Sequence, residues 1–237
     1  KYLLFLENAF PYMDNYNYHK GMNGIIQELK CLLKTKNIGT DSDQALLLDF
    51  QAALETKPEK AIKLEKDALA QIENITADNA RLVSNLHANL GGLYRMNGHP
   101  DLAREHMEKS ISLLDQFNLL HINDSIPQIA NYAMFLTEQQ EPERGISELQ
   151  KLSGIIKEYH SDDCLDYAKV QETLATIYLM TANLPQAKTH FKRAFKIYEK
   201  IWADEPEMIE AKYQEIQELY PQIGFSIGKN LSGLLTK

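Results

Sequence analysis

The sequence has few cysteines, no long apolar run and a deficit of basic residues. Only two Cys occur among 237 residues, Cys31 and Cys164, which excludes a disulfide framework and predicts a reducing, cytoplasmic compartment. No apolar run approaches the ~18 residues of a transmembrane helix, so no membrane association is expected. The net charge of -8 disfavours nucleic-acid binding, because neutralising phosphates requires clustered Lys and Arg.

The rest of the composition is that of a folded chain. Hydrophobic residues make up 44% and charged residues 24%, which argues against disorder. The length allows one large domain or two small ones. Because the first residue is Lys rather than Met, we expect the chain to be a piece of a longer protein.

An internal repeat with a step of 42 residues organises the chain. Small residues, large apolar residues and prolines all recur at this step. The small column is Ala61, Ala103, Gly145 and Ala187; the larger column is Ala52, Tyr94, Leu136, Tyr178 and Tyr220; the prolines are Pro58, Pro100 and Pro142, with Pro185 one residue out of step. Several columns in one register indicate a true repeat.

Each repeat unit predicts two antiparallel helices. Leu90, Gly91 and Tyr94 lie on one helical face, and the prolines suit the first turn of the second helix, where a missing N–H is tolerated. The small column marks the point where the two helices approach closely. Such pairs must stack to bury their apolar faces, so the sequence predicts a solenoid. Pairs are expected from about residues 2, 42, 84, 126, 168 and 210.

The signature residues resemble those of a known family. The segments Leu90–Tyr94 and Leu174–Tyr178, each ending nine residues before a small residue, resemble the tetratricopeptide (TPR) signature, and the 42-residue period is similar to the kinesin-light-chain type. The resemblance implies an all-α, right-handed superhelical solenoid over residues 1–237 as a single domain of five to six helix pairs. Asp49 and Gln217 depart from the pattern, because a small residue is expected there. An atypical C-terminal helix is predicted near residues 222–236.

No residue pattern indicates catalysis, a metal or a cofactor. The seven His are scattered, without the paired spacing of a zinc site. Residues 224–230 are similar to a P-loop, but they are one residue short between the glycines and have Asn230 where Ser or Thr is needed. The acidic neighbours of Cys164 would raise its thiol pKa, which disfavours a nucleophile. We therefore predict a non-enzymatic chain with no cofactor.

The resemblance implies that the first helix of each pair lines a concave groove that binds a protein or peptide. Amide side chains there offer both donors and an acceptor to a peptide backbone, and flexible Met adapts to apolar side chains. The predicted binding residues are Asn85, Asn89, Gly92, Met96, Asn131, Met134, Lys169, Thr173, Thr176 and Met180. The alternative for Asn89 and Asn131 is that they bond neighbouring helices instead.

Two further groups have a competing structural interpretation. Leu47 and Phe50 occupy equivalent groove positions, but burial under the first unit or a terminal helix is the stronger interpretation for them. A basic stripe at helical spacing could bind an acidic partner, although an exposed helix face explains it as well. The stripe is Lys188, Lys192, Lys196 and Lys200, with Arg193 beside them.

Three functions are compatible with this pattern. The first is a non-enzymatic protein-interaction scaffold that binds a peptide or helix in its groove. The second is a peptide-sensing regulatory domain of a larger protein, with an N-terminal effector such as a DNA-binding domain. The third, a support for an appended catalytic domain, has the least evidence, because fold alone gives no activity.

Overall fold

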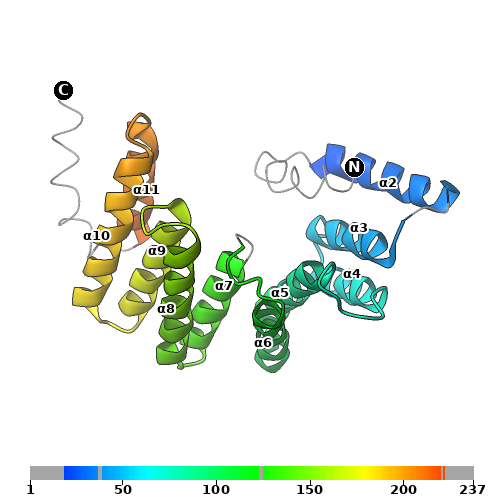
Figure 1. Cartoon of the computed structure of the whole chain (residues 1–237), viewed down its shortest axis with the longest axis horizontal. Helices are drawn as coiled ribbons and strands as arrows, with labels where there is room; N and C mark the ends of the chain where they lie inside the picture. Colours follow the sequence, from blue (N-terminus) through cyan, green and yellow to red (C-terminus); the bar gives the residue numbers. More distant parts are fainter. Residues whose placement is uncertain (1–18, 37–38, 123–124, 220, 222–237) are drawn as a thin grey trace. The chain divides into compact units, whose positions relative to one another are not determined.

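The computed structural model describes residues 19–36, 39–122, 125–219 and 221, and these residues form ten helices and no strand (Figure 1). The helices are α2 (His19–Lys36), α3 (Asp41–Ala53), α4 (Pro58–Ala70), α5 (Ala80–Met96), α6 (Pro100–Gln116), α7 (Ser125–Glu138), α8 (Pro142–Tyr159), α9 (Leu165–Met180), α10 (Leu184–Ile201) and α11 (Pro206–Leu219). The predicted all-α class is confirmed. The C-terminal helix predicted near 222–236 and the P-loop-like segment 224–230 lie outside the described residues.

Local sequence signals set where the helices begin. The Thr40 hydroxyl accepts a hydrogen bond from the Asp43 backbone N–H at 3.2 Å, and the Asp43 carboxylate accepts one from the Thr40 N–H at 2.7 Å. This capping box satisfies two N–H groups that the helix itself leaves unpaired. Pro58, Pro100 and Pro142 each stand at the first position of a second helix, as predicted.

The turns between paired helices also follow the repeat. Gly98, Gln140 and Ala182, each 42 residues from the next, all have positive φ, at 75°, 65° and 58°. In the first of these turns the next backbone N–H donates to a carbonyl five residues earlier, from His99 to Tyr94 at 2.9 Å. This Schellman-type ending needs a left-handed residue, which only Gly adopts without strain.

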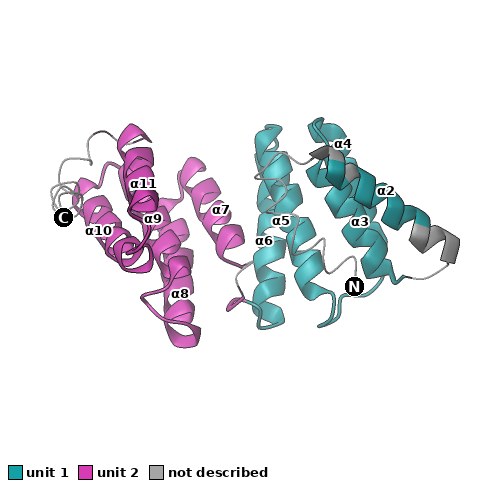
Figure 2. Cartoon of the chain, turned by 90° about the horizontal axis from the view of Figure 1, so that it is seen from above, with its two compact units in different colours: residues 1–119 teal, residues 120–237 magenta. Residues whose placement is uncertain are grey.

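The chain divides into two compact units, Lys1–Leu119 and Leu120–Lys237 (Figure 2). In unit 1, α3 pairs with α4 and α5 with α6, while α2 packs on α3. In unit 2, α7 pairs with α8 and α9 with α10, and α11 packs on α10. The first helices α3, α7, α9 and α11 begin within about four residues of the expected positions, as does α5. The single-domain organisation stays a prediction.

Small residues allow close helix packing in both units. A Cβ added at Gly91 on α5 would lie 2.5 Å from Cγ of Met107 on α6. A Cβ added at Gly145 on α8 would lie 2.6 Å from the backbone oxygen of Ala133 on α7. Side chains larger than a hydrogen therefore do not fit at either position without movement of the neighbour.

Each unit buries its own apolar clusters. In unit 1, Ile26 and Leu29 of α2 pack against Leu47 and Phe50 of α3. In unit 2, a larger cluster joins α9, α10 and α11. Its buried members are Ala175, Ala187, Phe191, Phe195 and Ile216. The apolar clusters thus join neighbouring helices within each unit.

Candidate protein-binding face

We use the name first-helix face of unit 2 for the outward repeat positions of α7, α9 and α11. These positions follow the 42-residue step, so residues on successive first helices occupy equivalent places. The members are Asn131 and Met134 on α7, Lys169, Thr173, Thr176 and Met180 on α9, and Ala211 and Glu215 on α11. The face contains six of the ten predicted binding residues.

The side chains on this face are mostly accessible. Asn131 and Lys169 are exposed, the Met180 side chain is 48% exposed, and Met134 is partly buried. The hydroxyl of Thr173 donates to the Lys169 carbonyl at 3.0 Å, and that of Thr176 donates to the Glu172 carbonyl at 3.1 Å. Because these donors are engaged within α9, the two hydroxyls present acceptors outward.

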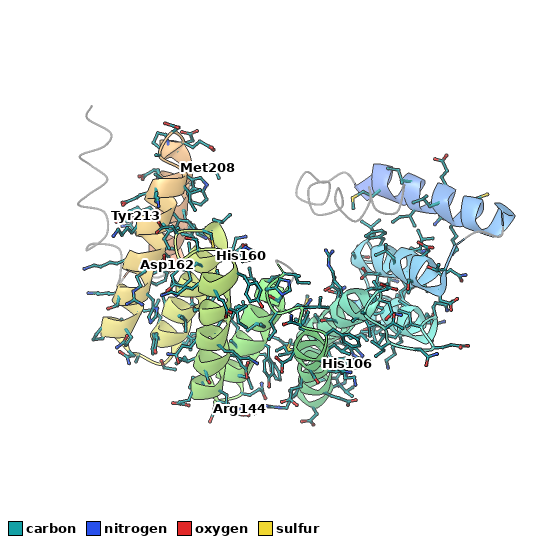
Figure 3. The ribbon with its side chains drawn as sticks, viewed as in Figure 1. His106, Arg144, His160, Asp162, Met208 and Tyr213 are labelled. Atoms are coloured by element: carbon teal, nitrogen blue, oxygen red, sulfur yellow. The ribbon has the colours of Figure 1, made fainter. Side chains whose placement is uncertain are left out.

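A cavity of about 280 Å³ opens on this face between α9, α10 and α11. Lys169 of α9 and Ala211 of α11, which are 42 residues apart, lie on its wall together with Glu215. The remaining lining residues are Leu165, Tyr198, Trp202, Met208 and Lys212. Figure 3 labels Met208 near the start of α11, where its side chain is 44% exposed. The cavity therefore joins a predicted binding residue to an aromatic and aliphatic surface.

The aromatic wall of the cavity is held in place by a polar network. The Tyr198 and Trp202 rings stack with centroids 4.8 Å apart and planes inclined by 10°. The Tyr198 hydroxyl donates to Oε2 of Glu172 at 2.6 Å, and Lys212 Nζ lies 2.9 Å from Oε1 of the same carboxylate. Burial and the nearby Glu172 carboxylate raise the pKa of Tyr198, so its hydroxyl stays a donor.

Lys212 is fixed by the same carboxylates. Burial alone would lower its pKa, but its bonds to Glu172 and Glu215 outweigh burial and raise the pKa instead. Lys169 lies at 3.8 Å from Asp166 and its side chain is more than half exposed. This arrangement can accept an apolar side chain against the partly buried Trp202, which stacks on the buried Tyr198 ring, with the Lys169 ammonium accessible to an acceptor at the edge.

The predicted binding residues of unit 1 have different surroundings. Met96 is 81% exposed, and Gly92 has no atom within 4 Å of an added Cβ. Asn85 is partly buried. The Asn89 amide nitrogen donates to Asp49 Oδ1 at 2.8 Å and to Glu65 Oε1 at 3.2 Å. Asn89 therefore bonds neighbouring helices, which was its alternative interpretation.

The two groups with competing interpretations are also located. Leu47 and Phe50 are buried beneath α2, so burial under the first unit is confirmed for both. In the basic stripe, Lys192, Lys196 and Lys200 are exposed on α10, and Lys200 pairs with Asp163. The stripe is thus an exposed helix face with one ion pair within its own unit.

A pair of histidines in unit 1 is a feature that sequence spacing did not predict. Nδ1 of His87 on α5 lies 2.9 Å from Nδ1 of His106 on α6, and Tyr94 stacks on the His106 ring. They border a cavity of about 490 Å³, with Glu105, Glu108, Lys109 and Ser112. Burial and the neighbouring His106 lower the pKa of His87 to about 4, and burial lowers that of His106.

The aromatic wall of the unit 2 cavity was also missed from the sequence. Trp202 is the single Trp of the chain and lies directly after α10, while Met208 and Lys212 lie on the next first helix. Continuing the repeat columns by one further step leads from Lys169 to Ala211 and from Thr173 to Glu215. That step would have indicated α11 as part of the face.

Two other features are absent from the described part of the chain. No group of three or more His, Cys, Asp or Glu side chains within the described ranges is placed to hold a metal ion. Among the helices that the structure describes, none has the length and apolar character needed to cross a bilayer.

Similar proteins agree with the repeat pattern. Residues 125–200 match the family model of the tetratricopeptide repeat. None of the curated proteins matches the chain. Tetratricopeptide repeats generally mediate protein–protein interaction, and proteins of this family are generally non-enzymatic scaffolds.

Solved structures show the same fold at low sequence identity. BtubC (BKLC) from P. vanneervenii has a TM-score of 0.68 and 16% identity, over 92% of this chain and 89% of that chain. A structure of nearly identical TPR-like repeats from a Podosopora anserina kinesin light chain protein has a TM-score of 0.61 and 13% identity, over 83% and 96%. MamA has a TM-score of 0.53 and 15% identity, over 79% and 94%. The predicted resemblance to tetratricopeptide-repeat proteins of the kinesin-light-chain type is thereby confirmed.

Proposed function

We propose that this chain is a protein-interaction scaffold that binds a peptide or helix of a partner along the first-helix face of unit 2. The observation that supports this most strongly is the cavity between α9, α10 and α11. It brings Lys169, a predicted binding residue, beside the stacked Tyr198 and Trp202 rings. An apolar anchor in a preformed pocket, with polar contacts around it, is the usual arrangement of an energetically important contact.

The accessible part of the face supplies the remaining contacts. Asn131 on α7 offers donors and an acceptor to a peptide backbone, and Met180 on α9 offers a flexible apolar surface. The Tyr198–Glu172–Lys212 network keeps the cavity wall rigid, so little conformational entropy is lost when a partner binds. These features favour capture of an extended or helical segment over enzymatic chemistry.

Charge reversal at two matched lysines tests the proposal. Lys169→Glu changes the cavity edge on α9, whereas Lys192→Glu changes an exposed residue on α10 of the same unit. Partners recovered with the native chain are identified by mass spectrometry, and their affinities for both variants are then measured. We expect Lys169→Glu to weaken binding by tenfold or more, about 1.4 kcal/mol, and Lys192→Glu to leave it unchanged.

A cavity-filling variant provides the second arm. Ala211→Phe places an aromatic ring where the partner's side chain is proposed to bind, and circular dichroism establishes that the fold is retained. Loss of binding in both Lys169→Glu and Ala211→Phe supports the proposal. Binding that survives both variants but is lost in Lys192→Glu would place the interaction on the exposed face of α10 and overturn the proposal.

A further inference from the structure

The α3–α4 pair carries two carboxyl groups where the other described pairs are apolar. The repeat step places Asp49 on α3 and Glu65 on α4 at the positions where the paired helices meet. The equivalent pairs are Gly91 with Met107, Ala133 with Leu149, and Ala175 with Phe191, and all six of these residues are buried. The acidic pair therefore replaces an apolar helix contact.

Glu65 is buried more completely than a charged carboxylate tolerates. Its residue surface is 2% exposed, and no group in the described ranges donates a hydrogen bond to its Oε2 atom. The other oxygen, Oε1, accepts the Asn89 amide N–H at 3.2 Å, and the same amide nitrogen donates to Asp49 Oδ1 at 2.8 Å. An ionised carboxylate in such surroundings costs several kcal/mol, whereas a protonated one gains a donor.

The Glu65 carboxyl is acted on by Asp49 from α3 and by Asn89 from α5, and neither of these two described groups is a cation. Lys66, the next residue on α4, has its ammonium 5.5 Å from the centroid of the Tyr94 ring. Burial, followed by the charge and hydrogen bond of Asp49, raises the pKa of Glu65 to about 10, while the Asn89 bond opposes this.

We propose that Asp49 and Glu65 form a proton-binding site that holds one proton at neutral pH and thereby keeps two carboxylate charges from meeting at the α3–α4 contact, beside the Asn89 amide of α5. The ligand is a proton shared by two carboxyl groups. When it is lost, two carboxylates are left at one helix contact, and their repulsion loosens the α3–α4 pair. The site lies in unit 1 and does not depend on the binding face proposed in unit 2.

The direction of the pH dependence follows from this assignment. The folded pKa of Glu65 lies above its unfolded value of 4.5, so the folded state binds the extra proton between these two values. The stabilisation is complete below about pH 4.5 and is lost as the pH rises toward the folded pKa. A pair that was fully ionised at neutral pH would have no such dependence.

Carbon-13 NMR of the side-chain carboxyl groups in the full chain tests the site directly. We expect the Glu65 carboxyl carbon, assigned by its loss in Glu65→Gln, to have the shift of a neutral acid at pH 7. We also expect the Asn89 side-chain amide signals to move in the same titration step. A Glu65 signal that titrates near pH 4.5 would overturn the proposal. So would Asn89 amide shifts that stay constant while Glu65 titrates.

Hydrogen exchange of the α4 amides supplies an independent measurement between pH 5 and 8. The opening constant of the native chain is divided by that of Glu65→Gln, because the intrinsic exchange rate cancels in this ratio. We expect this ratio to rise about tenfold per pH unit, since one proton is linked to opening. Glu59→Gln, an exposed residue on the same helix, should give a constant ratio. A constant ratio for Glu65→Gln as well would refute the shared proton.

If Glu65→Gln does not fold, a second variant keeps the test decisive. The double change Asp49→Gly with Glu65→Met copies the Gly91 and Met107 pair of α5–α6. It removes both carboxyl groups and installs a contact that the chain already uses. The ratio of opening constants should again rise about tenfold per pH unit against the native chain, and a constant ratio would overturn the proposal.

Discussion

Unit 1 and unit 2 place equivalent repeat positions in different chemical surroundings. In unit 1, Asp49 and Glu65 meet across a helix pair, whereas Ala175 and Phe191 meet at the same positions in unit 2. The difference extends to a second pair of positions: His87 contacts His106 in unit 1, while Gln171 contacts His190 in unit 2 at 2.8 Å.

The comparison separates what the repeat fixes from what it leaves open. The α5–α6 pair of unit 1 and both helix pairs of unit 2 share a left-handed turn residue at the 42-residue step, and small residues and prolines recur in or close to the same register. The polar positions vary without breaking the fold. Unit 1 uses them for an internal network that engages Asn89, whereas unit 2 keeps Asn131 exposed on its first-helix face.

The largest expected effect concerns the glycines that allow close helix packing. Gly145→Ala in unit 2 directs a methyl group against the Ala133 backbone oxygen, which cannot move independently, so we expect a loss of about 2 kcal/mol. Gly91→Ala in unit 1 meets the flexible Met107 side chain and should cost about half as much. Thermal unfolding measures both, with Gly154→Ala, which has open space on α8, as the control. Equal losses would contradict the comparison.

The histidine pair predicts an acid sensitivity for unit 1. Because the pKa of His87 is lowered to about 4 from 6.5, the unfolded state binds more protons in that interval, and stability falls as the pH drops through it. His87→Gln copies the Gln171–His190 contact. The free energy of unfolding should therefore fall by about 1–2 kcal/mol less between pH 7 and pH 4 in the variant than in the native chain, allowing for solvent screening. Denaturant unfolding at pH 7 and pH 4 measures the effect. An unchanged pH dependence in the variant would contradict the assignment.

The two predicted groove asparagines should behave differently. Asn89→Ala removes the amide that bonds Asp49 and Glu65, so unit 1 should lose about 1–2 kcal/mol. Asn131→Ala changes an exposed side chain on α7 and should alter stability by less than about 0.5 kcal/mol. Chemical denaturation measures both variants. Similar stabilities for the two variants would show that the Asn89 bonds contribute little.

The smallest effect concerns the turns. Gln140 and Ala182 in unit 2 hold positive φ, where their unit 1 counterpart is Gly98. Gln140→Gly and Ala182→Gly should each stabilise unit 2 by about 0.5–1 kcal/mol, because Gly adopts this conformation without strain. Gly98→Ala should have the opposite effect. The melting temperatures of the three variants are sufficient, and a fall with Ala182→Gly would contradict the turn assignment.

Much of the fold could be predicted because its signals are local and repeated. Pro58, Pro100 and Pro142 indicated the starts of second helices, and the column containing Gly145 indicated the close contact. Burial of Leu47 and Phe50, under the first unit or a terminal helix, was also predicted, and the structure shows them packed beneath α2 of the first unit. The left-handed conformation of Gln140 and Ala182 had no such signal, because neither residue type prefers positive φ.

The site was less predictable because its contacts cross between helices. The sequence gives no sign that Asn89 reaches Asp49, 40 residues earlier, or that Trp202 stacks on Tyr198 at the edge of a cavity. Asp49 departs from the tetratricopeptide pattern, which has a small residue at this position, but only the structure shows that α4 places Glu65 beside Asn89 as its partner. Binding by the first-helix face stays a prediction until a partner is tested.

Photo-crosslinking compares the two faces of unit 2 most directly. A photoreactive residue is placed at position 211, on the cavity wall, or at position 192, on the exposed face of α10, and crosslinked peptides are identified by mass spectrometry. The account predicts that one partner segment crosslinks at position 211 and not at position 192, and that Lys169→Glu abolishes the crosslink. A partner that crosslinks only at position 192, or equally at both, would contradict binding on the first-helix face.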